Sequence, residues 1–313
     1  MYRPKDFIKT AEGLIFAVVA DGIENGKVRC FLRYIQLDGH WRKIASDDAN
    51  RFLGQYYPQY LFHSTELDAH LHAVSGSDVS TYFSPRAILP RLLEQQSEDV
   101  VLTDLQNLCV LLQDEGISFK QIGITGSLLL GLQNSKSDID LVCYDREVFQ
   151  QLRQGVQSLI ARNLCQHLND QDWLDSYQRR SCELSLEEYI DHERRKHNKA
   201  MINHRKFDLS LVAPPRVSAV RRYLKLGKIR LETRVIEDQY AFDYPAEFGL
   251  EHPEIASVVS FTATYAGQAQ KGEYIQVAGQ LEEDELGVKR IVVGSSREAA
   301  GEYIKLTGND IAI

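Results

Sequence analysis

The chain has 313 residues, of which 43% are hydrophobic and 26% are charged, and its formal net charge is −8. This is the composition of an ordinary globular protein with enough apolar residues for its cores, so the fold needs no disulfide or metal. The negative balance argues against a large, unspecific nucleic-acid-binding surface. Five dispersed cysteines without a CxxC pair indicate reduced thiols rather than a zinc site.

The apolar stretches of the chain are short. The stretch Leu14–Ala20 is far shorter than a helix that crosses a bilayer. The first residues, Met1–Asp6, lack the apolar core of a signal peptide. We therefore expect a cytoplasmic protein with no membrane partner, and the sequence leaves its oligomeric state open.

Residues 1–96 have the pattern of an α/β unit. Apolar runs and turn residues predict two strands, over 14–19 and 28–37, and two helices, over 49–57 and 86–94. The stretch 63–84 is polar and irregular. Its histidines are therefore expected at the surface or in loops: His63, His70 and His72.

Residues 97–215 form a second predicted domain, in which helices alternate with short strands. The apolar runs predict strands over 121–125, 139–144 and 206–212. Helix starts are predicted at Ser97, Leu128, Asp145 and Ser185, and Ser185 forms a capping box with Glu188.

Residues 216–313 are rich in predicted strands. Four short apolar runs are separated by glycine and acidic turns, over 228–235, 258–265, 274–281 and 289–293. Such spacing predicts a small antiparallel barrel or sandwich. The predicted fold class is thus α+β, with a central mixed sheet and helices between an N-terminal α/β unit and a C-terminal antiparallel β barrel or sandwich.

Two aspartates stand two residues apart in a predicted strand. Asp138 and Asp140 should point to one face, because side chains at i and i+2 of a strand share a face. Two carboxylates about 4 Å apart repel by roughly 4 kcal/mol at an effective dielectric near 20. Such a pair persists when a hard divalent cation binds between its oxygens.

A glycine and a serine precede this pair. Gly126 and Ser127 lie where one predicted strand ends and a short helix begins. Glycine lets the backbone approach a phosphate closely, and N–H groups at a helix start face an anion. The Ser127 hydroxyl adds a donor, so a phosphate site is predicted beside the carboxylates.

A third carboxylate stands on a later predicted strand. Asp208 lies at the beginning of an apolar run, and it joins the other two if its strand pairs beside theirs. Three carboxylates would hold two Mg²⁺ ions, or Mn²⁺ in their place. One ion would activate an acceptor hydroxyl, and the other would bind a triphosphate and neutralise the leaving pyrophosphate.

The order Gly126-Ser127, then Asp138-Ile139-Asp140, then Asp208 resembles the DNA polymerase beta-like nucleotidyltransferase superfamily. Its signature is a hydrophobic residue before Gly-Gly or Gly-Ser, then two acidic residues around a hydrophobic one, then a later acidic residue. The resemblance covers about the middle third of the chain. It implies a nucleotidyltransferase fold for the central mixed sheet, with ATP or another NTP as substrate.

The whole chain also resembles a group of predicted, mainly archaeal nucleotidyltransferases. The shared stretches are Thr10–Val19, His192–Lys196, Val259–Thr262 and Ser296–Ile304. This closer resemblance says little about the acceptor, because the activity of that group is itself largely a prediction.

A basic run follows the capping box. Arg194, Arg195 and Lys196 lie near the end of the predicted helix and could clamp a triphosphate or an RNA backbone. They would equally suit a solvated helix end, where cations interact with the negative pole of the helix dipole.

The sequence therefore predicts an enzyme that transfers a nucleoside monophosphate from an NTP to an acceptor hydroxyl and releases pyrophosphate. Asp138, Asp140 and Asp208 are its predicted metal ligands, and an RNA end is its first predicted acceptor. Small molecules and protein side chains are further acceptors that the superfamily resemblance allows. Two alternatives stay open: a non-catalytic module that binds nucleotide or RNA, and a protein-modifying component of a toxin–antitoxin system.

Overall fold

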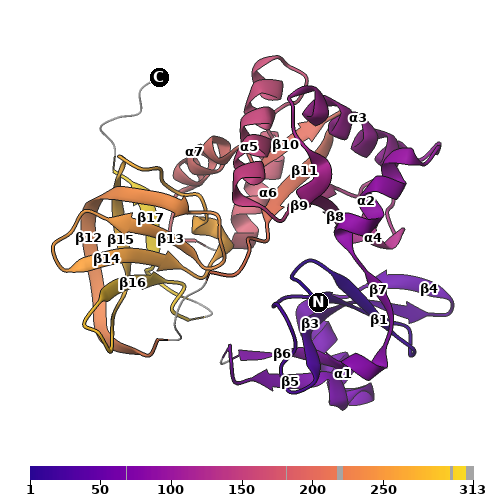
Figure 1. Cartoon of the computed structure of the whole chain (residues 1–313), viewed down its shortest axis with the longest axis horizontal. Helices are drawn as coiled ribbons and strands as arrows, with labels where there is room; N and C mark the ends of the chain where they lie inside the picture. Colours follow the sequence, from indigo (N-terminus) through magenta and orange to yellow (C-terminus); the bar gives the residue numbers. More distant parts are fainter. Residues whose placement is uncertain (68, 181, 217–220, 297–298, 308–313) are drawn as a thin grey trace. The chain divides into compact units, whose positions relative to one another are not determined.

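The computed structural model describes residues 1–67, 69–180, 182–216, 221–296 and 299–307 (Figure 1). It divides into two compact units: Met1–Gly155 with Ile202–Val212, and Val156–Met201 with Ala213–Ile313. Three sheets and several helices confirm the predicted α+β class. Each of the three predicted domains carries one sheet, although the chain groups into two units. Among the described residues, no helix combines the length and apolarity that a membrane crossing requires.

The first sheet is antiparallel and lies wholly in the N-terminal 83 residues. Its order is β5-β6-β3-β2-β1-β7, and β4 pairs with β3. The strands are β1 (Phe7–Thr10), β2 (Leu14–Val18), β3 (Lys27–Leu37), β4 (His40–Lys43), β5 (Leu61–Ser64), β6 (Ala69–Ser75) and β7 (Val79–Phe83). One helix, α1 (Ser46–Tyr56), buries Ala49 and Leu53 in the core of this sheet, beside Phe16. Two short 3-10 turns complete this region, η1 (Pro58–Tyr60) and η2 (Gly76–Asp78).

The stretch 63–84 corrects the sequence prediction, because it holds all of β6 and β7 rather than irregular chain. Leu71, Ala73 and Val74 of β6 are buried. Polar residues conceal this run in the sequence, and pairing with β3 and β5 makes it a strand.

His72 is a buried residue of this sheet, contrary to its predicted surface position. The Leu32 amide donates to His72 Nδ1 at 2.9 Å, and His72 Nε2 lies 2.8 Å from Asn50 Oδ1. Burial, with a smaller effect of Arg33, lowers the pKa of His72 to about 4. The fold therefore holds the neutral imidazole, with Nδ1 as acceptor.

Acid should destabilise the N-terminal sheet through His72. Its folded-state pKa lies below the ordinary 6.5, so the unfolded chain takes up the proton first. The contribution of neutral His72 to the free energy of unfolding is complete above about pH 6.5. It is lost as pH drops toward about 4, by roughly 3 kcal/mol in total. An NMR titration should place the His72 pKa near 4. His72→Gln should flatten the decline of the melting temperature with pH, whereas His63→Gln should preserve it; a His72 pKa near 6.5 would contradict this account.

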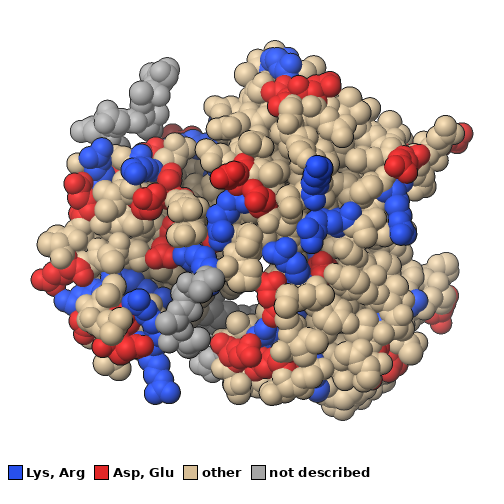
Figure 2. Space-filling view, viewed as in Figure 1, with Lys and Arg blue, Asp and Glu red and all other residues tan. Residues whose placement is uncertain are grey.

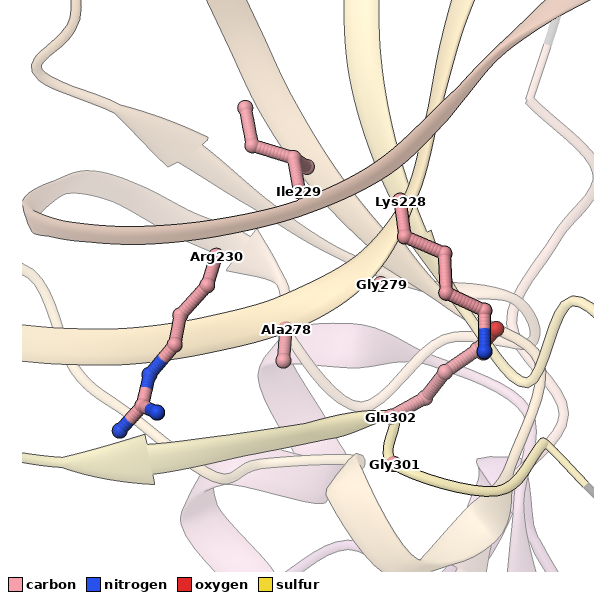
Figure 3. Close-up of a pocket in the computed structure, with 7 residues that line it drawn as sticks. All are labelled: Lys228, Ile229, Arg230, Ala278, Gly279, Gly301 and Glu302. Carbon is pink, nitrogen blue, oxygen red and sulfur yellow. The ribbon is translucent and has the colours of Figure 1, made fainter.

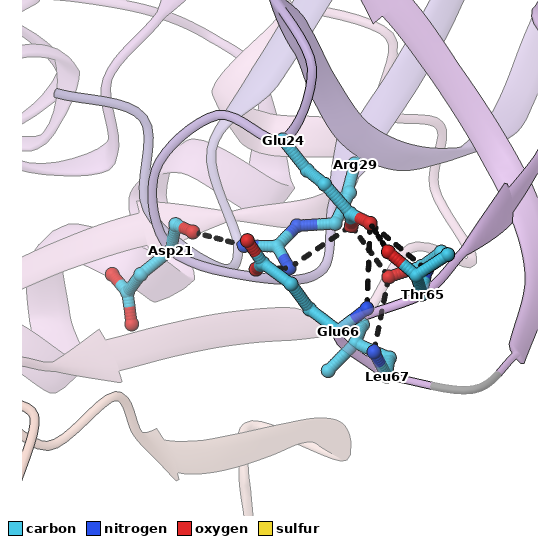
Figure 4. Close-up of polar contacts among 7 residues, drawn as sticks. Asp21, Glu24, Arg29, Thr65, Glu66 and Leu67 are labelled. Atoms are coloured by element: carbon cyan, nitrogen blue, oxygen red, sulfur yellow. Dashed lines mark hydrogen bonds and ion pairs between the residues drawn. The ribbon is translucent and has the colours of Figure 1, made fainter. Parts of the chain in front are cut away.

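A buried carboxylate ties down the loop after β5 (Figure 4). Glu24 accepts hydrogen bonds from Ser64 Oγ at 2.6 Å and from the Thr65 amide at 2.9 Å. Arg29 pairs with Glu24 and Glu66. These contacts satisfy the buried charge of Glu24, so the group has a structural role.

The second sheet is mixed, as predicted for the central domain. Its order is β10-β11-β9-β8; β9 and β11 are parallel, and β8 and β9 are antiparallel. The strands are β8 (Ile122–Thr125), β9 (Ile139–Cys143), β10 (Lys199–Ile202) and β11 (Arg205–Leu211). The helices of this region are α2 (Pro85–Glu94), α3 (Val100–Asp114), α4 (Gly126–Leu130) and α5 (Arg146–Ala161), with the 3-10 turn η3 (Phe119–Gln121) before β8. The cap of α3 is Asp99, which accepts from the Val101 amide, rather than the predicted Ser97.

The third sheet closes into a barrel. The ring runs β12-β13-β14-β16-β15 and returns to β12, and β17 extends it beside β15. Its strands are β12 (Tyr223–Tyr240), β13 (Ala246–Leu250), β14 (Ile255–Ser260), β15 (Tyr274–Asp284), β16 (Lys289–Val293) and β17 (Tyr303–Leu306), with the 3-10 turn η4 (Ala263–Tyr265). The predicted antiparallel pattern holds except between β14 and β16, which are parallel. Two helices of the same unit are α6 (Asp170–Arg180) and α7 (Leu186–Lys196), and the predicted Ser185–Glu188 capping box is confirmed.

Candidate active site

The three predicted aspartates lie at one end of the parallel strand pair in the first unit. Asp208 of β11 is the direct register partner of Asp140 of β9. Asp138 directly precedes β9, two residues before Asp140, and is exposed. The apolar neighbours of the pair are buried: Ile139, Leu141, Phe207 and Leu209. Burial of these side chains turns Asp140 and Asp208 to the opposite face, where adjacent strands lie about 4.8 Å apart.

The carboxyl group of Asp140 has a perturbed pKa. Burial raises its pKa, and the charges of Asp208 and Asp138 raise it further, to about 6. Lys5 and Lys43 act in the opposite direction. A bound cation would relieve the electrostatic cost of keeping the Asp140 carboxylate charged beside two other acidic side chains.

The donor set fits a hard divalent cation by its chemistry, since it consists of carboxylate oxygens alone. Among the described residues, no three His, Cys, Asp or Glu side chains are already arranged as a metal-binding group. Asp138 and Asp208 are exposed, whereas Asp140 is half-buried.

Gly126 packs against the Asp140 carboxylate. The two are held together because Thr125, at the end of β8, pairs with Asp140 in β9. A Cβ at position 126 would lie only 2.3 Å from Asp140 Oδ2, and the Gly126 φ is +70°. Only glycine satisfies both the backbone angle and the close approach. Gly126 and Ser127 are half-buried, so the turn keeps a solvent-facing side.

The predicted basic clamp on α7 has other partners. Arg195 pairs with Glu273, and the buried Lys196 pairs with Glu193 and donates to the Thr264 carbonyl at 2.8 Å. These contacts lie within the second unit, whereas the three aspartates belong to the first. Arg194 is exposed. Arg195 and Lys196 thus make structural contacts within the second unit, which a helix pattern in the sequence does not reveal.

Loss of Lys196 should weaken the second unit. Lys196→Met leaves Glu193 buried with Lys199 as its remaining cation, at an expected cost of about 2 kcal/mol. The buried Trp173 belongs to the core of this unit, so its fluorescence can follow urea unfolding. Arg194→Met on the same helix is the control and should not change stability. Unchanged stability with weaker NTP binding in Lys196→Met would restore the phosphate-binding prediction.

A groove of about 310 Å³ lies on the barrel of the second unit (Figure 3). It is lined by Lys228, Ile229, Arg230, Ala278, Gly279, Gly301 and Glu302. Glu302 accepts from the amides of Gly294 and Ser295, so its charge is used within the fold. Glu302 is the one carboxylate among the residues that line the groove. Elsewhere, basic and acidic side chains are mixed on the face drawn in Figure 2.

Comparison with known proteins relates the whole chain to one archaeal protein of undefined activity. The chain is 34% identical, over 335 aligned residues, to the uncharacterized protein MJ1086 of Methanocaldococcus jannaschii. The alignment covers 97% of this chain and 98% of its relative. No family model matches the chain, and no solved structure matches it. The geometry of the site therefore has to carry any assignment of chemistry.

Proposed function

The chain belongs to the family of MJ1086, and for this chain we propose the activity of a nucleotidyltransferase that moves a nucleoside monophosphate from an NTP to an acceptor hydroxyl and releases pyrophosphate. The observation that carries the proposal is the parallel register of Asp208 with Asp140. Two strands from distant parts of the chain thereby place carboxylates side by side, next to a turn that must be glycine. This combination of an acidic cluster and a close-approach turn suits a nucleotide with its metal ions.

Each residue has a defined part in this reaction. Asp138 and Asp140 would hold both Mg²⁺ or Mn²⁺ ions, and Asp208 would hold the ion on the acceptor side. When bound, such ions would neutralise charge on the triphosphate and would lower the pKa of the acceptor hydroxyl. Gly126 lets the backbone approach the phosphates, and the Ser127 hydroxyl donates to them. Asp208, which is exposed on β11 beside Asp140, would orient the acceptor hydroxyl and accept its proton.

An RNA end is the acceptor that we propose first, because the barrel has a surface suited to a single strand. Across the sheet, Arg230 pairs with Ala278, and Ala278 pairs with Tyr303. Arg230 and Tyr303 flank the small Ala278, with the Arg230 guanidinium 5.9 Å from the centre of the Tyr303 ring, and Lys228 lines the same groove as Arg230 (Figure 3). Cations that follow a backbone and an aromatic ring that stacks on a base are the features of single-strand recognition.

The test is transfer of label from each of four α-labelled NTPs, with MgCl₂ or MnCl₂ and total RNA. Label in RNA that depends on Asp140 supports the full proposal. Label in protein retains the transfer chemistry but overturns the RNA acceptor, as expected for a protein-modifying enzyme. Nucleotide binding without label in RNA, protein or a small molecule overturns the enzymatic proposal and indicates a non-catalytic module.

A further inference from the structure

We infer that Lys5 and Lys43 of the N-terminal sheet bind the triphosphate of the nucleotide, so that this sheet forms one wall of the active site. The inference rests on the proposed function for the identity of the ligand. Its geometric basis is separate, because it concerns how the first sheet is attached to the Gly126 turn. All the residues concerned lie in the first unit.

Lys5 is fixed by its main chain beside that turn. Its carbonyl accepts a hydrogen bond from Thr125 Oγ1 at 2.8 Å, and its amide donates to Val18 at 3.0 Å. Thr125 directly precedes Gly126 and pairs with Asp140. Lys5 also has a φ of +75°, a conformation that costs a non-glycine residue about 1 kcal/mol and persists where the surroundings enforce it. The backbone of Lys5 is therefore held in one place relative to the carboxylates.

Lys43 reaches the same region through packing. It stands opposite Tyr34 in the pairing of β4 with β3. Tyr34 forms a buried cluster with Phe7, Ile15 and Leu129. Leu129 belongs to α4, the helix that begins at Gly126. The sheet that carries Lys43 is thus packed directly on the proposed phosphate-binding segment.

Lys5 lies just before β1 and Lys43 ends β4, so both stand on the sheet that Thr125 and Leu129 join to the Gly126 turn. Lys5 and Lys43 are exposed, and within the described part of the chain neither forms an ion pair. If divalent cations neutralise the carboxylates, the positive charges of Lys5 and Lys43 remain available to pair with a polyanion. A triphosphate is such a polyanion.

A second explanation would give the lysines only an electrostatic role toward Asp140. In that case their removal would raise the pKa of Asp140 and leave phosphate affinity unchanged. Phosphate affinity therefore separates the two roles without any turnover.

The probe is inorganic triphosphate, titrated by calorimetry into the full-length protein in MgCl₂. Lys5→Met and Lys43→Met should each weaken binding about tenfold, and the double variant about a hundredfold, as expected for loss of one charged hydrogen bond each. Lys5→Arg should restore affinity to within about threefold. Lys120→Met is the control, because Lys120 is exposed at the opposite end of β8. Circular dichroism of each variant verifies the fold.

The outcomes distinguish this inference from the proposed function. If the wild type neither binds triphosphate nor transfers label, the proposed function fails and the inference fails with it. If the wild type binds and transfers while the folded double variant binds triphosphate equally well, the inference alone is overturned.

Discussion

Asp140→Asn is expected to abolish nucleotidyl transfer while leaving the fold intact. The amide preserves the shape of the side chain, but it removes the central carboxylate of the cluster and with it a ligand to both proposed ions. Metal ions contribute several kcal/mol to such reactions, so the rate should fall on the order of 1,000-fold. Asp208→Asn should have a similar effect, and Asp114→Asn, at the exposed end of α3, should have none. The measurement is single-turnover transfer of label from NTP.

The same substitution should stabilise the metal-free protein. The pKa of Asp140 is raised from 3.8 to about 6, so the folded state binds this proton more tightly than the unfolded state. The contribution to stability is complete below about pH 4 and is lost as pH rises through about 6. At pH 7.5 Asp140→Asn should therefore be more stable, on the order of 2 kcal/mol after allowing for partial exposure.

Thermal unfolding in EDTA between pH 4 and pH 8 tests this second effect. The wild type should lose stability across pH 6 relative to Asp140→Asn. Transfer at the wild-type rate in Asp140→Asn would remove the assigned metal role, and equal pH profiles would show that the carboxyl is not held in the described environment.

Gly126→Ala should disable the site through a clash. The new Cβ would meet Asp140 Oδ2 at 2.3 Å, and backbone and carboxylate can separate only if the turn or Asp140 moves. A misplacement of about 1 Å near reacting groups can reduce the rate about 100-fold. The expected result is a loss of at least that size in kcat/KM.

Gly131→Ala is a matched control for this clash. Gly131 ends the same short helix with a φ of +66°, and nothing lies within 4 Å of its added Cβ. Both variants share the penalty of a left-handed alanine, about 1 kcal/mol, but only Gly126→Ala disturbs Asp140. Equal activities in the two variants would mean that the close approach at Gly126 has no part in function.

The sequence by itself determined the local features of this protein. The apolar residues around Asp140 and Asp208 specify two strands, and each strand is found. The Ser185–Glu188 capping box begins α7 as predicted. These features depend on residues within a few positions of one another, so a local pattern is sufficient to predict them.

Only the tertiary structure decided which distant residues meet and which charges are covered. The register of Asp208 on Asp140, the parallel pairing of β14 with β16 and the attachment of Lys5 to Thr125 all join segments far apart in the chain. Burial likewise placed His72 in a core and Lys196 in an ion pair, where the sequence suggested exposed positions. The physical reason is that strand pairing and desolvation depend on the surfaces that the folded chain brings together, and a local pattern carries no information about the opposite surface.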